Sequence, residues 1–492
     1  MMKPRRALLL VATAWGAFAL AQDGIRLDPS FMPELLPQTT AVRSVLPLYD
    51  GRMALIEFWQ DQNNLFHNEL GCLHANGVRD STFSSLSGAL DLYPWNDGAF
   101  FSWQNYSGNH INRHHVVNGA VDNGYHTATN GMPGLYAMSY LWDVNMDAEG
   151  RAYVIGMIDL LDTADGLLGP RDLIRLDQQG GMDTSFTPAN TPGLMETFPL
   201  PDGHVLMGGT QWVYNDVPVE PLFLVNGDGS VDENFHTSFI EARPTSVLPL
   251  PDGGMIVTGQ FVDFVSLIEL DTLFVAKLLP DGTCDPSFNS NLRPYQQIHS
   301  GMYTTISSIV PWGANSYLIS GNFDEVDGLP NRGIAMIDAS GQLVPGACTW
   351  PGPGVPQEDG IYISLVQDGH GGVIAYGAFN GFDDGQHVSV AQGLARFVPG
   401  AVGIHEIGGK EPSVRLYPTP ASSRAWLEWD PGDPLVSAVL CDGMGRALMR
   451  IPIASMTNRT ALDLRGFAAG TYLVCAIHRS GVQSTVRSMV MP

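Results

Sequence analysis

Four histidines form the densest group of potential metal ligands in this 492-residue sequence: His110, His114, His115 and His126. Two or three neutral imidazole nitrogens, completed by a water molecule, suffice to hold a zinc or copper ion. The four histidines lack the fixed spacing and the carboxylate partner that would mark such a site. We therefore interpret them as hydrogen-bonded residues of loops and strand edges, and we assign no metal site.

Two groups of acidic residues in turns are the next candidates for chemistry. They are Asp324, Glu325 and Asp327, and Asp159, Asp162 and Asp165. Oxygen ligands of this kind bind calcium, but the segment DTADG is too short for an EF-hand loop and lacks its final glutamate. Aspartate is also common in turns because its side chain accepts backbone hydrogen bonds. We predict structural turns and no cofactor, with weak calcium binding as the alternative.

Tryptophans near polar turns offer a third chemistry, because flat rings stack on the apolar faces of sugars. Those in or beside the apolar segments described below are Trp59, Trp95, Trp103, Trp142, Trp212 and Trp312. A protein built of small sheets uses such rings mainly as core. A carbohydrate site is the alternative interpretation.

Motifs of common catalytic sites are missing from the sequence. It has no phosphate-binding loop GxxxxGK[ST], no zinc motif HExxH and no nucleophile turn GxSxG. We therefore predict no catalytic residues and no enzymatic activity.

The N-terminus has the features of a secretory signal peptide. Lys3, Arg5 and Arg6 precede a fifteen-residue apolar stretch that ends in Ala-Leu-Ala at Ala21. This pattern predicts cleavage after Ala21 and export of the remaining chain. The stretch is too short for a spanning helix and no later one is longer, so we expect no membrane insertion.

Charge limits the partners of the exported chain. The sequence has 25 basic and 50 acidic residues, and removal of the three basic signal residues leaves a net charge of −28. Such a surface repels phosphate groups, which excludes nucleic acid and anionic membranes as expected partners. Five scattered cysteines argue against a disulfide framework, although Cys441 and Cys475 fall in one predicted domain and could pair.

A recurring sequence phrase, clearest as PDGTCDPSF, indicates the secondary-structure elements that must position the candidate residues above. It consists of a turn with glycine, two free positions, aspartate, two more positions and an aromatic residue. The turn supplies the backbone of a tight hairpin, and the aromatic residue should enter the core at the same place each time. Copies end at Phe31, Phe83, Tyr125, Phe186, Phe235 and Phe288. A period near fifty residues indicates one supersecondary unit used repeatedly.

A second phrase, out of step with the first, consists of two apolar segments joined by a polar turn. Its seven copies begin at Ser44, Leu92, Val144, Thr197, Ser246, Ser308 and Leu365. Each predicts a β-hairpin, and a third strand such as 273–278 or 333–338 follows it. Units of this length with up to four strands match a β-propeller. We predict an all-β, seven-bladed β-propeller over residues 22–400, closed by pairing of the segment before Phe31 with the last blade; the copy at 339–347 is degenerate.

The segment GNFDEVDGLPNRGIAMIDASG at 321–341, together with the repeated DGxxDxSF ending, resembles the delta-60 repeat. That resemblance covers about residues 23–400 and implies a bacterial β-propeller of exported proteins. The family is known for its architecture, so it implies no catalytic residues.

Beyond a predicted linker at 401–412, the sequence predicts seven short strands over residues 413–492, as in a small immunoglobulin-like β-sandwich. The segments LYPTPA, DGMGR, LDLRG and GTYLV resemble the C-terminal sorting domain of the type IX secretion system. The resemblance implies that the type IX secretion machinery is a partner. The implied signature positions are Pro418, Pro420, Gly443, Gly445, Arg446, Gly470 and Tyr472. An immunoglobulin-like accessory domain is the alternative.

Together these expectations describe a protein that is secreted or displayed on the outer cell surface after passing through the periplasm. Its function would be binding or display, with an extracellular glycan or protein as the ligand. The alternative is a propeller enzyme or carbohydrate-binding lectin with a site at the mouth of the central channel. Convergence of carboxylates or histidines at that mouth would favour the alternative.

Overall fold

A computed structural model describes residues 24–96, 98–104, 110–125, 135–162, 166–266, 269–296, 304–348, 350–354, 362–400, 414–417, 424–429, 431–432, 434–441, 447–451, 453, 458–467, 470–478 and 483–490. Every regular element in these ranges is a β-strand, so the described chain is all-β. The chain divides into two compact units, with Ile25–Pro399 in the first and Gly400–Pro492 in the second.

Seven antiparallel three-stranded meanders make up most of the described first unit. Their first strands are β2 (Ala41–Pro47), β6 (Ala89–Asn96), β9 (Leu135–Met146), β12 (Leu194–Pro199), β17 (Glu241–Pro249), β21 (Thr305–Trp312) and β27 (Tyr362–Gln367). Their second strands are β3 (Met53–Gln60), β7 (Ala99–Gln104), β10 (Ala152–Asp162), β13 (Val205–Gly209), β18 (Met255–Ser266), β22 (Ser316–Asn322) and β28 (Val373–Asp383). Their third strands are β4 (Phe66–Leu73), β8 (His110–His115), β11 (Gly166–Leu176), β16 (Leu222–Val225), β19 (Glu269–Leu278), β25 (Ile334–Asp338) and β29 (Val388–Pro399).

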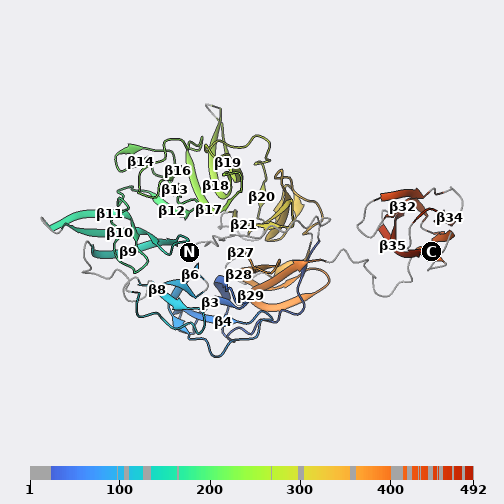
Figure 1. Ribbon diagram of the computed structural model, residues 1–492, viewed down its shortest axis with the longest axis horizontal. Coiled ribbons are helices and arrows are strands. Elements are labelled where there is room, and N and C mark those ends of the chain that lie inside the picture. Colours follow the sequence, from blue (N-terminus) through green and yellow to red (C-terminus); the bar gives the residue numbers. More distant parts are fainter. Residues whose placement is uncertain are drawn as a thin grey trace. The chain divides into compact units, whose positions relative to one another are not determined.

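These meanders are called the first to the seventh sheet below, in chain order; a single bridge between Gly209 and Ala242 joins the fourth to the fifth. Figure 1 shows them following one another around a common centre. Apart from β1, described below, the remaining strands of the unit are β5 (Leu86–Ser87), β14 (Val213–Tyr214), β15 (Val217–Pro218), β20 (Pro294–Tyr295), β23 (Glu325–Val326), β24 (Leu329–Pro330) and β26 (Gly352–Gly354), all of them short. The strands predicted at 273–278 and 333–338 are confirmed as parts of β19 and β25.

The first strand of the chain pairs with the last strand of the unit. β1 (Ile25–Leu27) runs antiparallel to β29, with Ile25 opposite Pro399 and Leu27 opposite Phe397. In six other sheets the recurring phrase supplies a single bridge at the same outer position: Leu73 to Arg79, His114 to Val121, Leu176 to Met182, Val225 to Val231, Leu278 to Cys284 and Ile337 to Leu343. The predicted pairing of the segment before Phe31 with the last strands is confirmed.

The core of the first unit lies between neighbouring sheets. Seven apolar clusters occur among the described residues, and each takes side chains from two consecutive sheets. One cluster joins Val42 and Leu55 of the first sheet to Ile374 and Leu394 of the seventh. A small sheet cannot bury both faces alone, so this alternation of sheet and cluster is what stabilises the repeats.

The aspartate and the aromatic residue of the recurring phrase have constant roles. In the best copy, Asp285 accepts hydrogen bonds from the backbone N–H and hydroxyl of Ser287, at 2.9 and 2.6 Å. Lys277 on the preceding strand lies 2.8 Å from the same carboxylate and lowers its pKa to about 2, with Ser287 contributing. Arginines of other third strands pair in the same way with Asp28, Asp122 and Asp183. Asp80 is paired differently, with Arg52 from the turn between β2 and β3.

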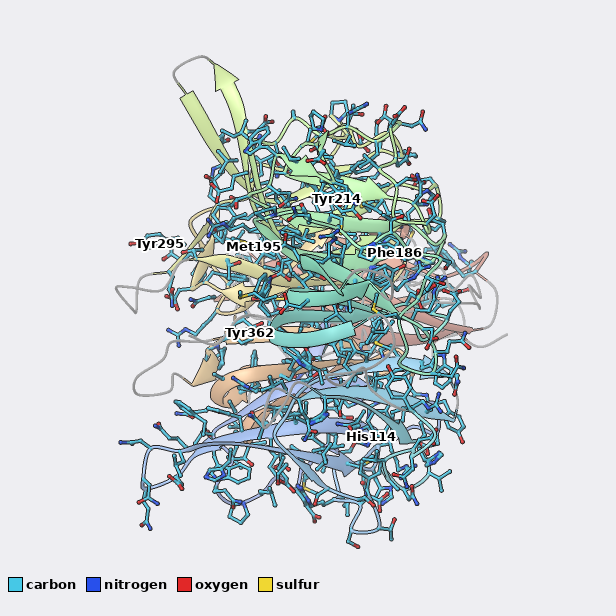
Figure 2. The ribbon with its side chains drawn as sticks, turned by 90° about the vertical axis from the view of Figure 1, so that its left-hand side faces the viewer. His114, Phe186, Met195, Tyr214, Tyr295 and Tyr362 are labelled. Atoms are coloured by element: carbon cyan, nitrogen blue, oxygen red, sulfur yellow. The ribbon has the colours of Figure 1, made fainter. Side chains whose placement is uncertain are left out.

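All six aromatic residues of the phrase are buried, which confirms their predicted place in the core: Phe31, Phe83, Tyr125, Phe186, Phe235 and Phe288. Figure 2 labels Phe186, which the guanidinium of Arg175 covers at 4.9 Å from the ring centroid. In the degenerate copy Ala347 stands three residues after Val344, where the other copies have the aromatic residue. Trp350 takes over the role by stacking on Phe397, with centroids 5.4 Å apart.

The second unit is a small two-sheet sandwich. One sheet contains β30 (Val414–Tyr417), β31 (Arg424–Trp429) and β34 (Arg459–Asp463); the other contains β32 (Leu435–Cys441), β33 (Ala447–Ile451), β35 (Gly470–His478) and β36 (Gln483–Val490). A shared core takes Leu427 and Leu462 from the first sheet and Leu440 and Val474 from the second. These strands match the seven that the sequence predicts.

Of the expected signature positions, the structure describes two. Gly470 begins β35, and the buried Tyr472 contacts Phe467 edge-on, with centroids 5.6 Å apart. Pro418, Pro420, Gly443, Gly445 and Arg446 lie outside the described residues. The side chains of Cys441 and Cys475 do so too, and Cys72, Cys284 and Cys348 are free thiols.

Candidate functional site

A cavity of about 400 Å³ lies where the first strands of four consecutive sheets end. Each of these strands ends at the turn that leads to its second strand, so we call the cavity the turn-end pocket. In spatial order its walls come from the seventh, first, second and third sheets. The lining segments are 366–370, 45–49, 92–96 with 99–100 and 116, and 145–146. The volume falls at the small end of the range for ligand sites in proteins.

Most first strands share a proline at the same position near their ends. Leu48 donates its N–H to the carbonyl of Arg52, so the N–H of the preceding residue would point away from β3. Proline, which has no N–H, stands at this position in five first strands: Pro47, Pro94, Pro199, Pro249 and Pro311.

The two exceptions to the proline pattern are Met146 and Gln367. The residues that follow them, Asp147 and Asp368, donate their N–H groups across the turn as Leu48 does. Both exceptions line the turn-end pocket, on the third and the seventh sheet. Two of the four wall strands, β9 and β27, therefore keep a backbone N–H at this position. They form the two ends of the row of four sheets around the pocket.

Aromatic and aliphatic side chains form the floor of the turn-end pocket. Tyr93 and Phe100 are buried, and Trp95 lies between Phe101, at 5.4 Å between centroids, and the Arg113 guanidinium, at 5.1 Å. At the rim Tyr49 is 61% exposed. A Cβ built on Gly51 would come within 3.3 Å of Nε2 of His370, which shows how closely the rims of the first and seventh sheets approach.

The carboxylate of the turn-end pocket serves the fold. Asp368 accepts from Nη2 and Nε of Arg396 at 2.6 and 2.9 Å, and from the backbone N–H groups of His370 and Gly372. Arg396 also reaches Asp28, at 3.3 Å, next to the end of β1. These bonds fix the position of Asp368, so its carboxylate serves the fold rather than a ligand.

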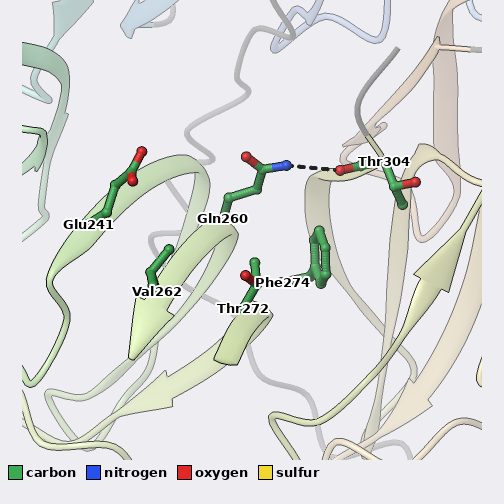
Figure 3. Close-up of a pocket in the computed structure, with 6 residues that line it drawn as sticks. All are labelled: Glu241, Gln260, Val262, Thr272, Phe274 and Thr304. Carbon is green, nitrogen blue, oxygen red and sulfur yellow. Dashed lines mark hydrogen bonds between the residues drawn. The ribbon is translucent and has the colours of Figure 1, made fainter. Parts of the chain in front are cut away.

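A second cavity, of about 340 Å³, lies on the fifth sheet at the end where β18 turns into β19. We call it the hairpin-end pocket. Figure 3 shows its lining residues: Glu241, Gln260, Val262, Thr272, Phe274 and Thr304.

Three of the four candidate histidines of the sequence, His110, His114 and His115, lie on β8. His114 is fully buried, and its ring lies 4.9 Å from that of Phe100. Its Nδ1 lies 2.9 Å from the Gly119 carbonyl, an acceptor, so Nδ1 carries the proton and Nε2 accepts from the Ser102 hydroxyl at 2.8 Å. Burial lowers the pKa of His114. Both nitrogens are thus committed to the fold, and His126 lies outside the described residues.

The acidic turns are tied into hydrogen bonds of their own. Asp327, in a left-handed conformation with φ of 52°, accepts the backbone N–H of Arg293 at 2.8 Å, and Asp324 lies 3.7 Å from Arg332. The side chain of Asp162 and all of Asp165 lie outside the described residues. Within the described ranges, no group of three or more His, Cys, Asp or Glu residues could hold a metal ion.

The tryptophans divide between core and surface. Trp103 and Trp312 are buried, as expected for core, whereas Trp212 is exposed on the hairpin of β14 and β15 and Trp59 stacks on His67. Only Trp95 of the predicted set lines a described pocket.

The sequence analysis did not identify Tyr49 and His370, which line the turn-end pocket. The two first strands that lack the proline, at Met146 and Gln367, were a sequence signal that could have indicated two of the walls of this pocket.

Comparisons with known proteins give only distant likeness. No protein-family model and no curated protein matches the chain. Among solved structures it is similar to the extracellular domain of a hybrid two-component system of B. thetaiotaomicron, with 12% identity, a TM-score of 0.37, and coverage of 96% of this chain and 58% of that one. A puromycin hydrolase gives 15% identity, a TM-score of 0.39, and coverage of 82% and 62%. The chain thus spans less than two thirds of either structure.

Within the described residues, no helix has the length and apolar character needed to cross a membrane.

Proposed function

We propose that this chain is a non-enzymatic binding protein whose first unit holds a small amphipathic ligand in the turn-end pocket. One observation carries the proposal: four consecutive sheets contribute equivalent strand ends to one cavity of about 400 Å³. Its floor is apolar and aromatic, whereas its rim has Tyr49, Asn96 and His370. Few polar groups over an apolar floor are typical of sites that bind small molecules.

The pairing of β1 with β29 supports a closed ring of seven blades, in which each of the seven sheets is one blade of a propeller. The apolar cluster between the seventh and first sheets supports the same arrangement, because it repeats the contact made by every other neighbouring pair. In such a ring the first strands surround a central channel, and the turn-end pocket lies at one mouth of it.

Binding is preferred over catalysis because of how the polar groups at this mouth are used. Asp368 is held by Arg396 and two backbone N–H groups, so it lacks the freedom of a general base. His370 is the one histidine among the described residues that line the pocket. A single histidine without an orienting carboxylate or a nucleophile gives weak support to the enzyme alternative.

The binding proposal is tested by screening small molecules against the purified chain, with thermal shift and tryptophan fluorescence as readouts. Ligands of the turn-end pocket should alter the emission of Trp95. They should bind about 5- to 30-fold more weakly to Tyr49→Ala and His370→Ala, since loss of a stacking or hydrogen-bonding partner costs about 1–2 kcal/mol. Tyr295→Ala is the matched control, because Tyr295 on β20 is 56% exposed and is not among the residues that line this pocket; Figure 2 labels it. Equal losses in all three variants would refute the assignment.

For the second unit we propose a role as the secretion address of the protein. Its support is the sequence resemblance to type IX sorting domains, together with a core of its own that lets it fold as a module. Together with the signal peptide, this role gives a protein that is secreted or held on the outer cell surface.

Deletion of residues 413–492 in a host with the type IX pathway tests this address. The truncated first unit should accumulate in the periplasm, because the machinery would no longer recognise it. Its normal appearance outside the cell would instead support the accessory-domain alternative.

A further inference from the structure

From its geometry, we propose that the hairpin-end pocket is a second binding site, specific for a neutral carbohydrate. Its walls come from one face of the fifth sheet. The register places Glu241 opposite Val262, and Val262 opposite Thr272, so the three side chains form a row across β17, β18 and β19. Thr304, immediately before β21 of the sixth sheet, forms the facing wall.

Gln260 has a fixed orientation in this pocket. Its amide nitrogen donates to the carbonyl oxygen of Thr304 at 3.1 Å, and a carbonyl can only accept, so the two ends of the amide are not interchangeable. Figure 3 shows the amide oxygen pointing away from Thr304. Gln260 therefore presents an acceptor. A break in the β18 to β19 register, between Thr258 and Phe261, accompanies this placement.

The other polar groups of the pocket also favour a ligand rich in donors. One oxygen of Glu241 accepts from Arg243 at 2.7 Å, and a carboxylate has further lone pairs to offer. The hydroxyl of Thr272 can donate or accept. Two acceptors and a hydroxyl around one cavity match a molecule with several hydroxyl groups.

Phe274 supplies an apolar surface beside these acceptors. Its ring is half-buried and packs against the cluster between the fifth and sixth sheets, so it is held in place before any ligand binds. An aromatic ring flanked by hydrogen-bonding groups suits a sugar, which has an apolar C–H face and hydroxyls around its edge.

The ion pair of Glu241 decides between a sugar and an organic cation. A cation site would need an unneutralised carboxylate facing the ring of Phe274. Here the guanidinium of Arg243 already compensates the charge of Glu241, the one acidic side chain among the described residues that line the pocket. A neutral polyol keeps this ion pair and adds hydrogen bonds to it.

The test is an array of neutral mono- and oligosaccharides probed with the purified full chain, followed by calorimetric titration with the methyl glycoside of the best sugar. The double variant Glu241→Gln, Thr272→Val should lower the affinity at least about tenfold, because it weakens the charge-assisted bond to Glu241 and removes the neutral hydrogen bond to the Thr272 hydroxyl. Glu220→Gln is the matched control, since Glu220 is also half-exposed and paired, with His236 at 3.1 Å. It should leave the affinity unchanged.

Three results would overturn the proposal. The first is that no neutral sugar binds, and the second is that the double variant and the control bind equally well. The third is that spermidine competes for the site and its binding disappears both in Glu241→Gln and at high salt, which would identify a cation site. Tyr49→Ala separates this proposal from the binding function of the turn-end pocket, because it should not change the affinity for the sugar.

Discussion

His114 is buried in its neutral form, with each ring nitrogen in a hydrogen bond and a phenyl ring against its face. A second proton would reverse the hydrogen bond with the Ser102 hydroxyl and place a charge on a fully buried ring. His114, one of the candidate metal ligands of the sequence, therefore has a structural role. Its protonation should change the free energy of unfolding.

Acidification should destabilise the protein through His114. Its pKa in the folded state is lowered below the usual 6.5, so the unfolded chain binds the proton first as the pH falls. The contribution of neutral His114 to the free energy of unfolding should be complete above pH 6.5. At lower pH the free energy of unfolding should decrease, by at most about 1.4 kcal/mol per pH unit. Denaturant titrations of wild type and His114→Gln between pH 7.5 and 5.5 measure this effect.

The His114→Gln variant should lose less stability over this pH range than wild type does. His115→Gln, which alters an exposed neighbour on the same strand, is the control and should follow wild type. Parallel pH curves for wild type and both variants would show that His114 does not cause the loss.

At the scale of the element, the repeated aromatic residue locks each sheet to the next. Phe288 is buried in the cluster between the fifth and sixth sheets, whereas Trp350 replaces the missing aromatic residue between the sixth and seventh and keeps part of its surface exposed. In the degenerate copy, the aromatic contact between sheets is therefore made by Trp350, three positions after Ala347.

Truncation of these two residues should rank accordingly. Phe288→Ala should lower the free energy of unfolding by about 3–5 kcal/mol through lost packing and a cavity, and Trp350→Ala should lower it by less, because its side chain is only partly buried. Met32→Ala, at a position 72% exposed, serves as the baseline. An unfolding midpoint unchanged by Phe288→Ala would contradict the alignment of the repeats.

Local signals explain why the sequence predicted these elements well. Hairpin turns and aromatic residues at fixed offsets depend on residues near each other in the chain, so seven hairpins, the third strands and the buried aromatics could be predicted. The turn-end pocket depends on residues as distant as Tyr49 and His370, which only the pairing of the first and last segments brings together. Gln260 gave no signal at all, because its role depends on a carbonyl of the next sheet.

At the scale of the whole molecule, the seventh sheet depends on the first residues of the unit. β1 pairs with β29, and Asp28 joins Asp368 in binding Arg396. Deletion of residues 24–31 should therefore loosen 362–399 more than any other sheet. Hydrogen exchange measured by mass spectrometry should show the largest gain in exchange there and the smallest in the fourth and fifth sheets. A gain spread evenly over all sheets would contradict this dependence.

The pairing of β1 with β29 also sets an order of events during synthesis. β1 leaves the ribosome first, yet its partner follows only after about 370 further residues. At roughly 5 to 20 residues per second, this interval is on the order of 20 to 75 s. Throughout that time β1 lacks its partner strand β29. A chain that ends before Phe397 therefore carries an unpaired strand near its beginning. Premature termination would thus mark the product at its opposite end, where a protease or chaperone can recognise it.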